Sequence, residues 1–373
     1  MTHTHDQTRN QHDLQLYRRF ANNGLGEWVP EVAAARGVAP MPPMPMPPMP
    51  VPPGPMPATP PAPPAQGLDG GVVVKPAKTP PTSGWRKLVH GMTGGRVNLG
   101  ASPRQQEHND LTNTIRTPLR GDYRVAVMSL KGGVGKTTTT VALGSVLAET
   151  RGDRVIAIDA NPDFGTLAQR VAADAASSAT IRDLLSAPDT DRYGQVRAYT
   201  TQGASRLEVI GSERDPAVSE AFSEDDYRRA VDILQHHYNL ILTDCGTGLM
   251  HSAMAGVLDL ANTLILVTSP ALDGAQSASA TLDWLNLHGY DRLAANAVVV
   301  VSSPSPKVAV QMDSVVGHFA ARTRAVHVIP YDSHLAEGAV IDVARMHPRT
   351  LRAYQELAAT LAMDFRQWHK HAR

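Results

Sequence analysis

The segment that most constrains this chain is an apolar strand that runs into a glycine-rich loop and then into a helix. It spans residues 126–140 and reads AVMSLKGGVGKTTTT. Its glycines leave room for the backbone to approach a ligand and can take φ > 0 at little cost. Such a loop wraps backbone N–H groups around a polyphosphate, and the dipole of the following helix adds positive potential there. The segment therefore predicts a nucleoside triphosphate site that also holds Mg²⁺.

Two lysines and a hydroxyl group have specific expected roles in this loop. Lys136 is expected to reach the β- and γ-phosphates, and Thr137 is expected to place its hydroxyl on Mg²⁺. The stricter pattern G-x-x-x-x-G-K-[ST] requires glycine at position 130, where this chain has Leu130, followed by Lys131. The other nucleotide-binding positions predicted from the loop are Gly132, Gly133, Val134, Gly135 and Thr138.

The string KGGVGKTT, residues 131–138, resembles the deviant Walker A loop K-G-G-x-G-K-[ST] of the MinD/ParA-like P-loop ATPases. This resemblance implies that Lys131 is the signature lysine, which in the family crosses a dimer interface to the nucleotide of the partner. It also implies ATP as the ligand and an ATP-dependent homodimer as the assembly. A plain glycine-rich turn between a strand and a helix is the alternative.

Two further apolar runs end in a carboxylate, which makes them candidates for the metal site. Residues 154–159 read RVIAID and residues 238–244 read YNLILTD, so Asp159 and Asp244 stand at predicted strand ends. Asp244 and the following CGTG resemble the Walker B and switch II pattern of the family, which implies that Asp244 holds the Mg²⁺ shell. We therefore assign Thr137, Asp159 and Asp244 to the metal. An ordinary aspartate at a strand end is the alternative.

The residues after Asp159 depart from the family pattern, which is usually D-x-D-P with the second aspartate positioning the attacking water. This chain has Asn161 in that place and Asp163 two residues later. An asparagine can orient water but cannot accept its proton, so either Asp163 substitutes or hydrolysis is slow. The catalytic candidates are Lys131, Lys136, Asn161 and Asp163.

Three more apolar runs predict strands, at residues 262–268, 297–301 and 325–329. Family members often read adenine with an asparagine after the later strand, and here Ser302 and Ser303 occupy that region, which leaves base recognition open. Residues 325–332 read AVHVIPYD and resemble the I-P-x-D edge that lies beside the base. This resemblance implies that Pro330 and Asp332 bind nucleotide, with plain strand-end residues as the alternative.

From residue 122 onward, predicted strands and helices alternate. This order predicts an α/β domain over 122–373 with a mostly parallel, doubly wound sheet, helices on both faces and ligands at the carboxyl ends of the strands. One of the predicted helices runs from about residue 276 to 287. The last one, over 348–368, either packs on the sheet or attaches peripherally to a membrane, as a short amphipathic helix does in MinD-type proteins.

The chain before this domain divides into three segments. Residues 1–38 are polar with room for one short helix, and residues 39–82 carry a Pro/Met tract, which forms either a largely disordered spacer or a docking ligand. Residues 83–121 contain a GWRK block and a helix that starts at a Ser102 cap. This arm either packs on the domain or docks a partner.

The proline-rich tract, the GWRK block and the segment RVAVMSLKGGVGKTTTTVALG together look like the EspI-type ATPases associated with ESX (type VII) secretion in actinobacteria. The resemblance implies a nucleotide-dependent dimeric switch that regulates such a system and contacts it through the proline-rich tract or the 83–121 arm. The alternatives are a ParA-type partition or chromosome-organising ATPase that binds DNA, and an ATP sensor that does not hydrolyse.

Charge and composition limit which partners and which cellular compartment we expect for this chain. Residues 1–120 hold 12 Lys and Arg against 7 Asp and Glu, whereas residues 121–373 hold 23 against 28. An acidic domain is a poor sequence-independent DNA binder, because such binding neutralises phosphates. The single cysteine, Cys245, excludes an intrachain disulfide and fits a reducing compartment. With no signal segment and no long apolar run, we expect a cytoplasmic protein, recruited at most to the inner face of the membrane.

Overall fold

The computed structural model describes residues 92–93, 102–161, 165–172, 179–212, 222–248, 251–303, 305 and 312–366. All of them belong to one compact unit, residues 76–373. The predictions made for residues 1–91, including the Pro/Met tract and the GWRK block, lie outside the described residues. Asp163 and residues 367–373 also lie outside them.

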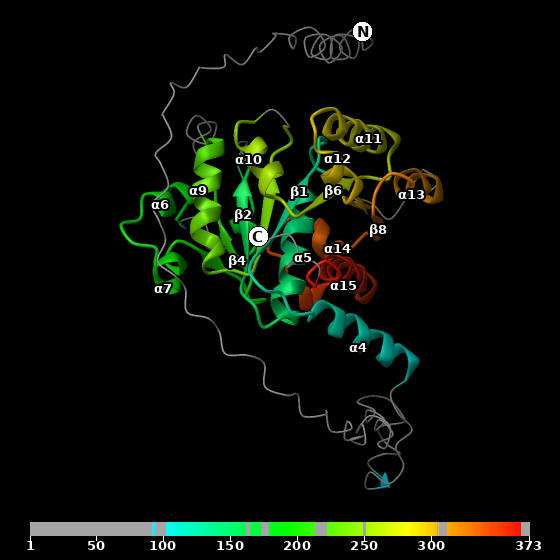
Figure 1. Ribbon diagram of the computed structural model, residues 1–373. Coiled ribbons are helices and arrows are strands. Elements are labelled where there is room, and N and C mark those ends of the chain that lie inside the picture. The colour runs from blue at the N-terminus through cyan, green and yellow to red at the C-terminus, as the bar shows by residue number, and fades with distance from the viewer. Residues whose placement is uncertain are drawn as a thin grey trace, which may run out of the picture. The chain divides into compact units, whose positions relative to one another are not determined.

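An eight-stranded sheet forms the centre of this unit (Figure 1). Its spatial order is β3-β4-β2-β5-β1-β6-β7-β8, and all neighbouring strands are parallel except β3 and β4. The strands are β1 (Tyr123–Met128), β2 (Val155–Ala160), β3 (Thr201–Gln202), β4 (Glu208–Ile210), β5 (Leu240–Cys245), β6 (Thr263–Thr268), β7 (Val298–Ser302) and β8 (Ala325–Ile329). The predicted mostly parallel sheet is confirmed.

Helices cover both faces of the sheet. One face carries α4 (Pro103–Ile115), α5 (Lys136–Thr150) and α15 (Pro348–Ala362). The other carries α9 (Glu224–Gln235), α10 (Ala253–Leu260), α11 (Leu272–Leu287), α12 (Asp291–Ala295) and α13 (Met312–Ala320). The shorter helices are η1 (Ala168–Arg170), α6 (Ile181–Leu185), α7 (Tyr193–Arg197), α14 (Ser333–Ala336) and η3 (Val343–Arg345).

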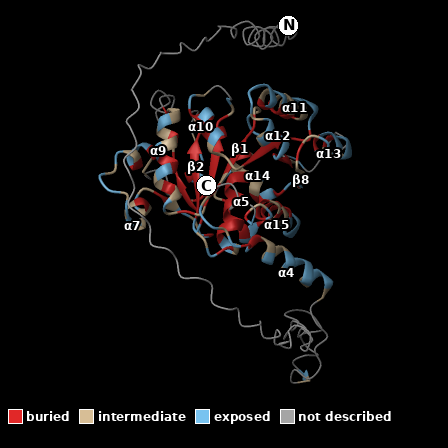
Figure 2. Cartoon of the chain, viewed as in Figure 1, coloured by how far each residue is buried: buried red, intermediate tan, exposed pale blue. Residues whose placement is uncertain are grey.

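Alternate side chains of the central strands enter two separate apolar cores, because successive residues of a strand point to opposite faces. In β1, Val125 and Val127 join the core beneath α5 and α15. Ala126 and Met128 join the core beneath α9, α10 and α11. Burial on both faces explains why the strands read as continuous apolar runs. Figure 2 shows the central strands and α5 buried, while α4 is largely exposed.

Two predicted helix limits were wrong. α11 begins at Leu272, before the expected start near residue 276, and its N-cap is Ala271. Asp273 in its first turn suits the positive end of the helix dipole. The last helix ends at Ala362 instead of residue 368, and residues 363–366 form a turn that brings Phe365 into the core.

The C-terminal helix α15 packs its apolar side into the core beneath it. Tyr354, Leu357 and Leu361 are buried on this side. The packed helix is therefore the alternative that the structure shows. Among the described residues, no helix is long and apolar enough to cross a membrane.

The helix α4 is attached to the same layer. Ser102 caps it, with the side-chain oxygen accepting the N–H of Gln105 at 3.3 Å. Arg151, which follows α5, donates to the carbonyl of Thr117 at 2.9 Å and also to that of Ile115. These bonds tie the end of α4 to the end of α5.

The buried side of α15 predicts a large effect on stability. We expect Leu357→Ala to lower the free energy of unfolding by about 2–5 kcal/mol, because it opens a cavity in the core. Met363→Ala, at a side chain that is 62% exposed, should change it by less than about 0.5 kcal/mol. Urea unfolding followed by circular dichroism measures both. Equal effects of the two substitutions would contradict this packing.

Candidate functional site

The loop between β1 and α5 bends tightly, and two of its glycines adopt left-handed backbone conformations. Gly133 has φ 75° and Gly135 has φ 94°. Gly135 is the N-cap of α5, and no side chain caps this helix within the described residues. The first N–H groups of α5 therefore remain available at its positive end, which is the arrangement that binds phosphate.

Lys136 lies buried at the base of this loop and pairs with Asp244. Its Nζ donates to Asp244 Oδ1 at 2.8 Å, and the two side chains are 8% and 1% exposed. Thr137 Oγ1 donates to Asp244 Oδ2 at 2.6 Å, and Thr140 Oγ1 donates to Oδ1 at 3.3 Å. The start of α5 is thus bound to the carboxyl end of β5. Three residues predicted to surround the phosphates and the metal lie together.

Asp159 lies beside Asp244, because β2 and β5 pair in parallel with these two residues in register. Its carboxylate accepts the backbone N–H groups of Asn161 at 3.2 Å and Leu167 at 3.1 Å. Burial, followed by the negative charge of Asp244, raises the pKa of Asp159 to about 7. A divalent cation would relieve the repulsion between these two carboxylates.

The donor set here fits Mg²⁺. It consists of the Thr137 hydroxyl and the carboxylates of Asp159 and Asp244, all at one edge of the sheet. Within the described residues, no group of three or more His, Cys, Asp and Glu side chains forms a metal cage. Mg²⁺ needs no such cage, because it keeps several waters and uses one or two carboxylates together with phosphate oxygens.

Gly165, which the sequence analysis did not single out, packs closely against the carboxylate of Asp159. A Cβ added at Gly165 would collide with Asp159 Oδ2 and Ser212 Oγ. Any other residue at this position must push the carboxylate away. Close packing of this kind arises from the tertiary fold, so no local sequence signal predicts it.

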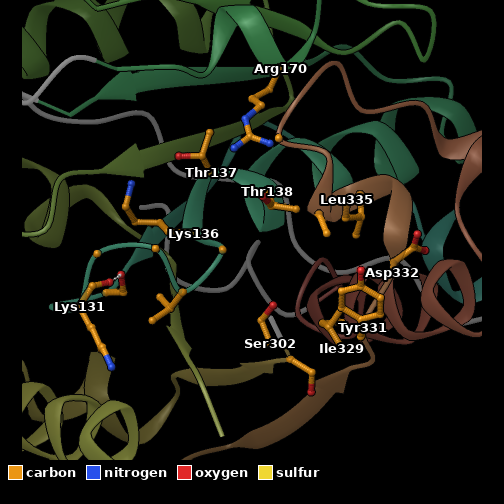
Figure 3. Close-up of a pocket in the computed structure, with 18 of the residues that line it drawn as sticks. Lys131, Lys136, Thr137, Thr138, Arg170, Ser302, Ile329, Tyr331, Asp332 and Leu335 are labelled. Atoms are coloured by element: carbon orange, nitrogen blue, oxygen red, sulfur yellow. Dashed lines mark hydrogen bonds between the residues drawn. The ribbon is translucent and has the colours of Figure 1, made fainter. Parts of the chain in front are cut away.

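A cavity of about 550 Å³ opens above the loop, at the carboxyl ends of the strands (Figure 3). This is the edge at which the sheet order predicts a ligand. Of the predicted site residues, those that line it are Lys131, Gly132, Gly133, Val134, Gly135, Lys136, Thr137, Thr138, Asn161, Pro330 and Asp332. Asp163 lies outside the described residues.

One end of the cavity is formed by residues at and just after the carboxyl ends of β7 and β8. Ser302, Ser303, Pro330 and Tyr331 line it there. Ser302 and Ser303, which occupy the region expected to contact the base, thus line the cavity.

Asp332 lines the same end, but its carboxylate is engaged with the backbone. It accepts the N–H groups of His334 at 3.0 Å and His347 at 2.8 Å, and it caps α14. Burial raises the pKa of Asp332, but these hydrogen bonds outweigh burial and hold the pKa below its ordinary value. Asp332 therefore shapes this end of the cavity, while Pro330 and Tyr331 present its surface.

Lys131 points away from Lys136 (Figure 3). Its ammonium group pairs with Asp273 at the start of α11, and the two side chains are 41% and 66% exposed. The hydrogen bond from Lys131 lowers the pKa of Asp273. The structure thus places Lys131 at the surface beside the cavity, away from the buried pair at its base.

Thr247 and Arg170 are among the lining residues that the sequence analysis did not single out. Thr247 lies in the CGTG segment that follows Asp244, and it lines the cavity. Arg170, the last residue of η1, lines it from the segment that follows β2. A single arginine in so short a helix carries no recognisable sequence pattern, so only the folded chain reveals its position.

Comparison with known proteins agrees with this geometry. A family model described as "AAA domain" matches residues 123–293. The ESX-1 secretion-associated protein EspI of Mycobacterium tuberculosis is 42% identical over 287 residues, which make up 76% of this chain and 42% of EspI. The sporulation initiation inhibitor protein Soj of Bacillus subtilis is 30% identical over 127 residues, or 32% of this chain and 48% of Soj. The chain belongs to the MinD/ParA-like P-loop ATPases.

The solved structure of the septum site-determining protein MinD of Pyrococcus horikoshii, complexed with Mg-ADP, matches with a TM-score of 0.53 and 20% identity. The match covers 68% of this chain and 100% of MinD, and it supports the MinD-like fold. This MinD/ParA-like chain spans less than half the length of EspI and of Soj. The matched AAA domain contains the loop, Asp159 and Asp244, whereas Pro330 and Asp332 lie beyond it.

The buried and the exposed lysine pairs predict different effects of removing a carboxylate. Without nucleotide, Asp244→Asn should lower the free energy of unfolding by about 3 kcal/mol, because it leaves the Lys136 ammonium buried without a counter-charge. Asp273→Asn should change it far less, because the Lys131 pair is exposed to solvent. Urea titrations of both variants measure the difference. An Asp244 variant as stable as the Asp273 variant would show that the buried pair contributes no more than the exposed one.

Proposed function

We propose that this protein is an ATP-binding, Mg²⁺-dependent switch that dimerises around ATP, hydrolyses it slowly and regulates an ESX (type VII) secretion system. The observation that carries the proposal is the meeting of Lys136, Thr137 and Asp244 beneath a glycine loop at the start of α5. These groups supply a cation, a hydroxyl and a carboxylate where the backbone already offers N–H donors.

In the nucleotide complex, the contacts at the base of the loop change partners. Lys136 leaves Asp244 for the β- and γ-phosphates, and the loop N–H groups donate to phosphate oxygens. Thr137 and Asp244, with Asp159 beside them, would hold Mg²⁺, which would neutralise charge on the phosphates. Displacing the Lys136–Asp244 contact links nucleotide binding to the packing of α5 on β5.

Slow hydrolysis follows from the side chain at position 161. Asn161 lines the cavity and its backbone N–H donates to Asp159, which supports a position near the phosphates. Its amide can orient an attacking water but cannot take the proton from it. An aspartate at this position would serve both tasks.

The position of Lys131 supports a dimer in which each lysine reaches the nucleotide of the other copy. Lys131 lies at the surface and contacts Asp273 instead of the cavity base. Because that pair is exposed, exchanging it for a phosphate of the partner has a small free-energy cost. This is the role that the resemblance to MinD/ParA-like proteins implies.

The secretion role rests on the similarity to EspI, an ESX-1 secretion-associated protein, which covers 76% of this chain. A partition role like that of ParA proteins has less support, since the net negative charge of residues 121–373 opposes binding to DNA. We place the protein in the cytoplasm, where ATP is available. A gel-shift assay with ATP and long duplex DNA at physiological salt separates the two roles, since retardation would favour partition.

Two substitutions in the same loop test nucleotide binding and dimerisation separately. Lys136→Ala should weaken ATP binding by about 100-fold or more, because a charge-assisted contact to the phosphates is lost. Lys131→Ala should keep ATP affinity within about threefold but weaken the ATP-dependent dimer by about tenfold. Calorimetry measures affinity and analytical ultracentrifugation measures the dimer. Unchanged ATP affinity of the Lys136 variant would exclude the proposed site.

A substitution at position 161 tests why hydrolysis should be slow. Asn161→Asp should raise the rate of phosphate release in a single turnover by about tenfold or more, since it supplies a general base. Asn161→Ala, the control, should lower the rate because it removes the water-orienting amide. A fast wild-type rate that neither substitution changes would show that position 161 does not limit turnover.

A further inference from the structure

We propose that Arg170 binds the phosphates at the sugar end of the nucleotide, as a third cation beside the two loop lysines. The inference rests on the proposed ATP site and extends it to a residue outside the loop. Its basis is the position of the guanidinium group, its lack of partners and the charges around it.

The Arg170 side chain reaches the cavity from η1, outside the loop. Figure 3 shows it reaching toward Thr137 and Thr138, and the three residues line the same cavity. Leu335, in α14, lines the wall beside it. Both terminal nitrogens lie 4.0 Å from the place that a Cβ would occupy at Gly338. Since Gly338 has φ 71°, a conformation that favours glycine, it leaves this space to the guanidinium group.

The backbone of Arg170 is held in place. Its carbonyl accepts the N–H of Ile341 at 2.8 Å, and its own N–H donates to the carbonyls of Thr166 at 3.2 Å and Leu167 at 3.1 Å. The Ile341 bond joins the segment after β2 to the segment before η3. A side chain that starts from a fixed backbone loses less freedom when it binds a ligand.

The guanidinium group lacks the partners that a half-buried arginine normally has. Arg170 Nη1 is buried without a hydrogen-bond partner, and the side chain forms no ion pair within the described residues. Burial lowers the pKa of Arg170, partly offset by the negative charge of Asp244. Leaving a donor of a charged group buried and unsatisfied is costly. An anion in the cavity would remove this cost.

The other two cations that line the cavity already have carboxylate partners. Lys136 pairs with Asp244, and Lys131 pairs with Asp273. Among the described lining residues, Arg170 is thus the cation without one. A guanidinium group offers a planar fork of donors that matches two phosphate oxygens, so a polyphosphate is the ligand that fits it.

The neighbours of Arg170 indicate which phosphates it meets. Leu335, Ala336 and Gly338 join it to the end of the cavity formed by Pro330 and Tyr331, where we expect the base. Lys136 and Asp244 lie at the base of the loop, where we expect the γ-phosphate and the metal. Arg170 therefore meets the α- and β-phosphates, which ATP and ADP share.

The test compares the affinities of the full chain for Mg-ATP and Mg-ADP by calorimetry. Arg170→Gln should weaken both by about 10- to 100-fold and by the same factor, because one charge-assisted contact to shared phosphates is lost. Arg170→Lys, which keeps the charge without the fork, should weaken both by about three- to tenfold. The matched control is Arg292→Gln, at an exposed arginine of α12 that lines a different cavity, and it should leave both affinities unchanged.

Each outcome separates this inference from the proposed function. If the wild type binds neither nucleotide, the proposed function fails and the inference fails with it. If the wild type binds and Lys136→Ala does not, an Arg170→Gln variant with affinities within twofold of wild type overturns the inference alone. A loss for ATP but not for ADP overturns the assignment to the shared phosphates. If the Arg170→Gln variant is unfolded at the assay temperature, the Arg170→Lys variant provides the test. Unchanged affinities of that variant for both nucleotides would overturn the inference.

Discussion

The buried ion pair between Lys136 and Asp244 is the interaction on which the rest of the site depends. It joins the first turn of α5 to the carboxyl end of β5, and each charge is compensated mainly by the other. Thr137 and Thr140 add hydrogen bonds to the same carboxylate. A buried pair of this kind is costly to break from one side alone. If a phosphate binds Lys136 while a metal ion binds Asp244, both buried charges remain compensated. The ion pair therefore favours binding of the two ligands together over binding of either one alone.

The parallel register of the sheet places the other charges around this pair. Asp159 lies next to Asp244 because β2 and β5 pair in register. The repulsion between the two carboxylates favours the binding of a cation there. Gly165 allows the following segment to close on Asp159, and the same segment continues to Arg170. Negative charge at the metal end and positive charge along the phosphates therefore follow from a few backbone contacts.

Much of this could be predicted from the sequence, because it depends on local patterns. Apolar β-branched runs indicated strands buried on both faces, and the motifs fell at the strand ends where ligands bind. The positions of Arg170, Gly165 and Tyr331 could not be predicted, because they depend on contacts between segments far apart in the chain. The backbone bond between Arg170 and Ile341 is one such contact. The engagement of Asp332 with the N–H of His347 is another.

The most direct test of the central claim is a crystal structure of this chain with Mg²⁺ and a non-hydrolysable ATP analogue. The account predicts that the Lys136 ammonium has left Asp244 and contacts the β- and γ-phosphates. It also predicts that Mg²⁺ lies between the Thr137 hydroxyl and the Asp244 carboxylate. A nucleotide bound elsewhere, or bound in the cavity with the Lys136–Asp244 contact at 2.8 Å still intact, would contradict it.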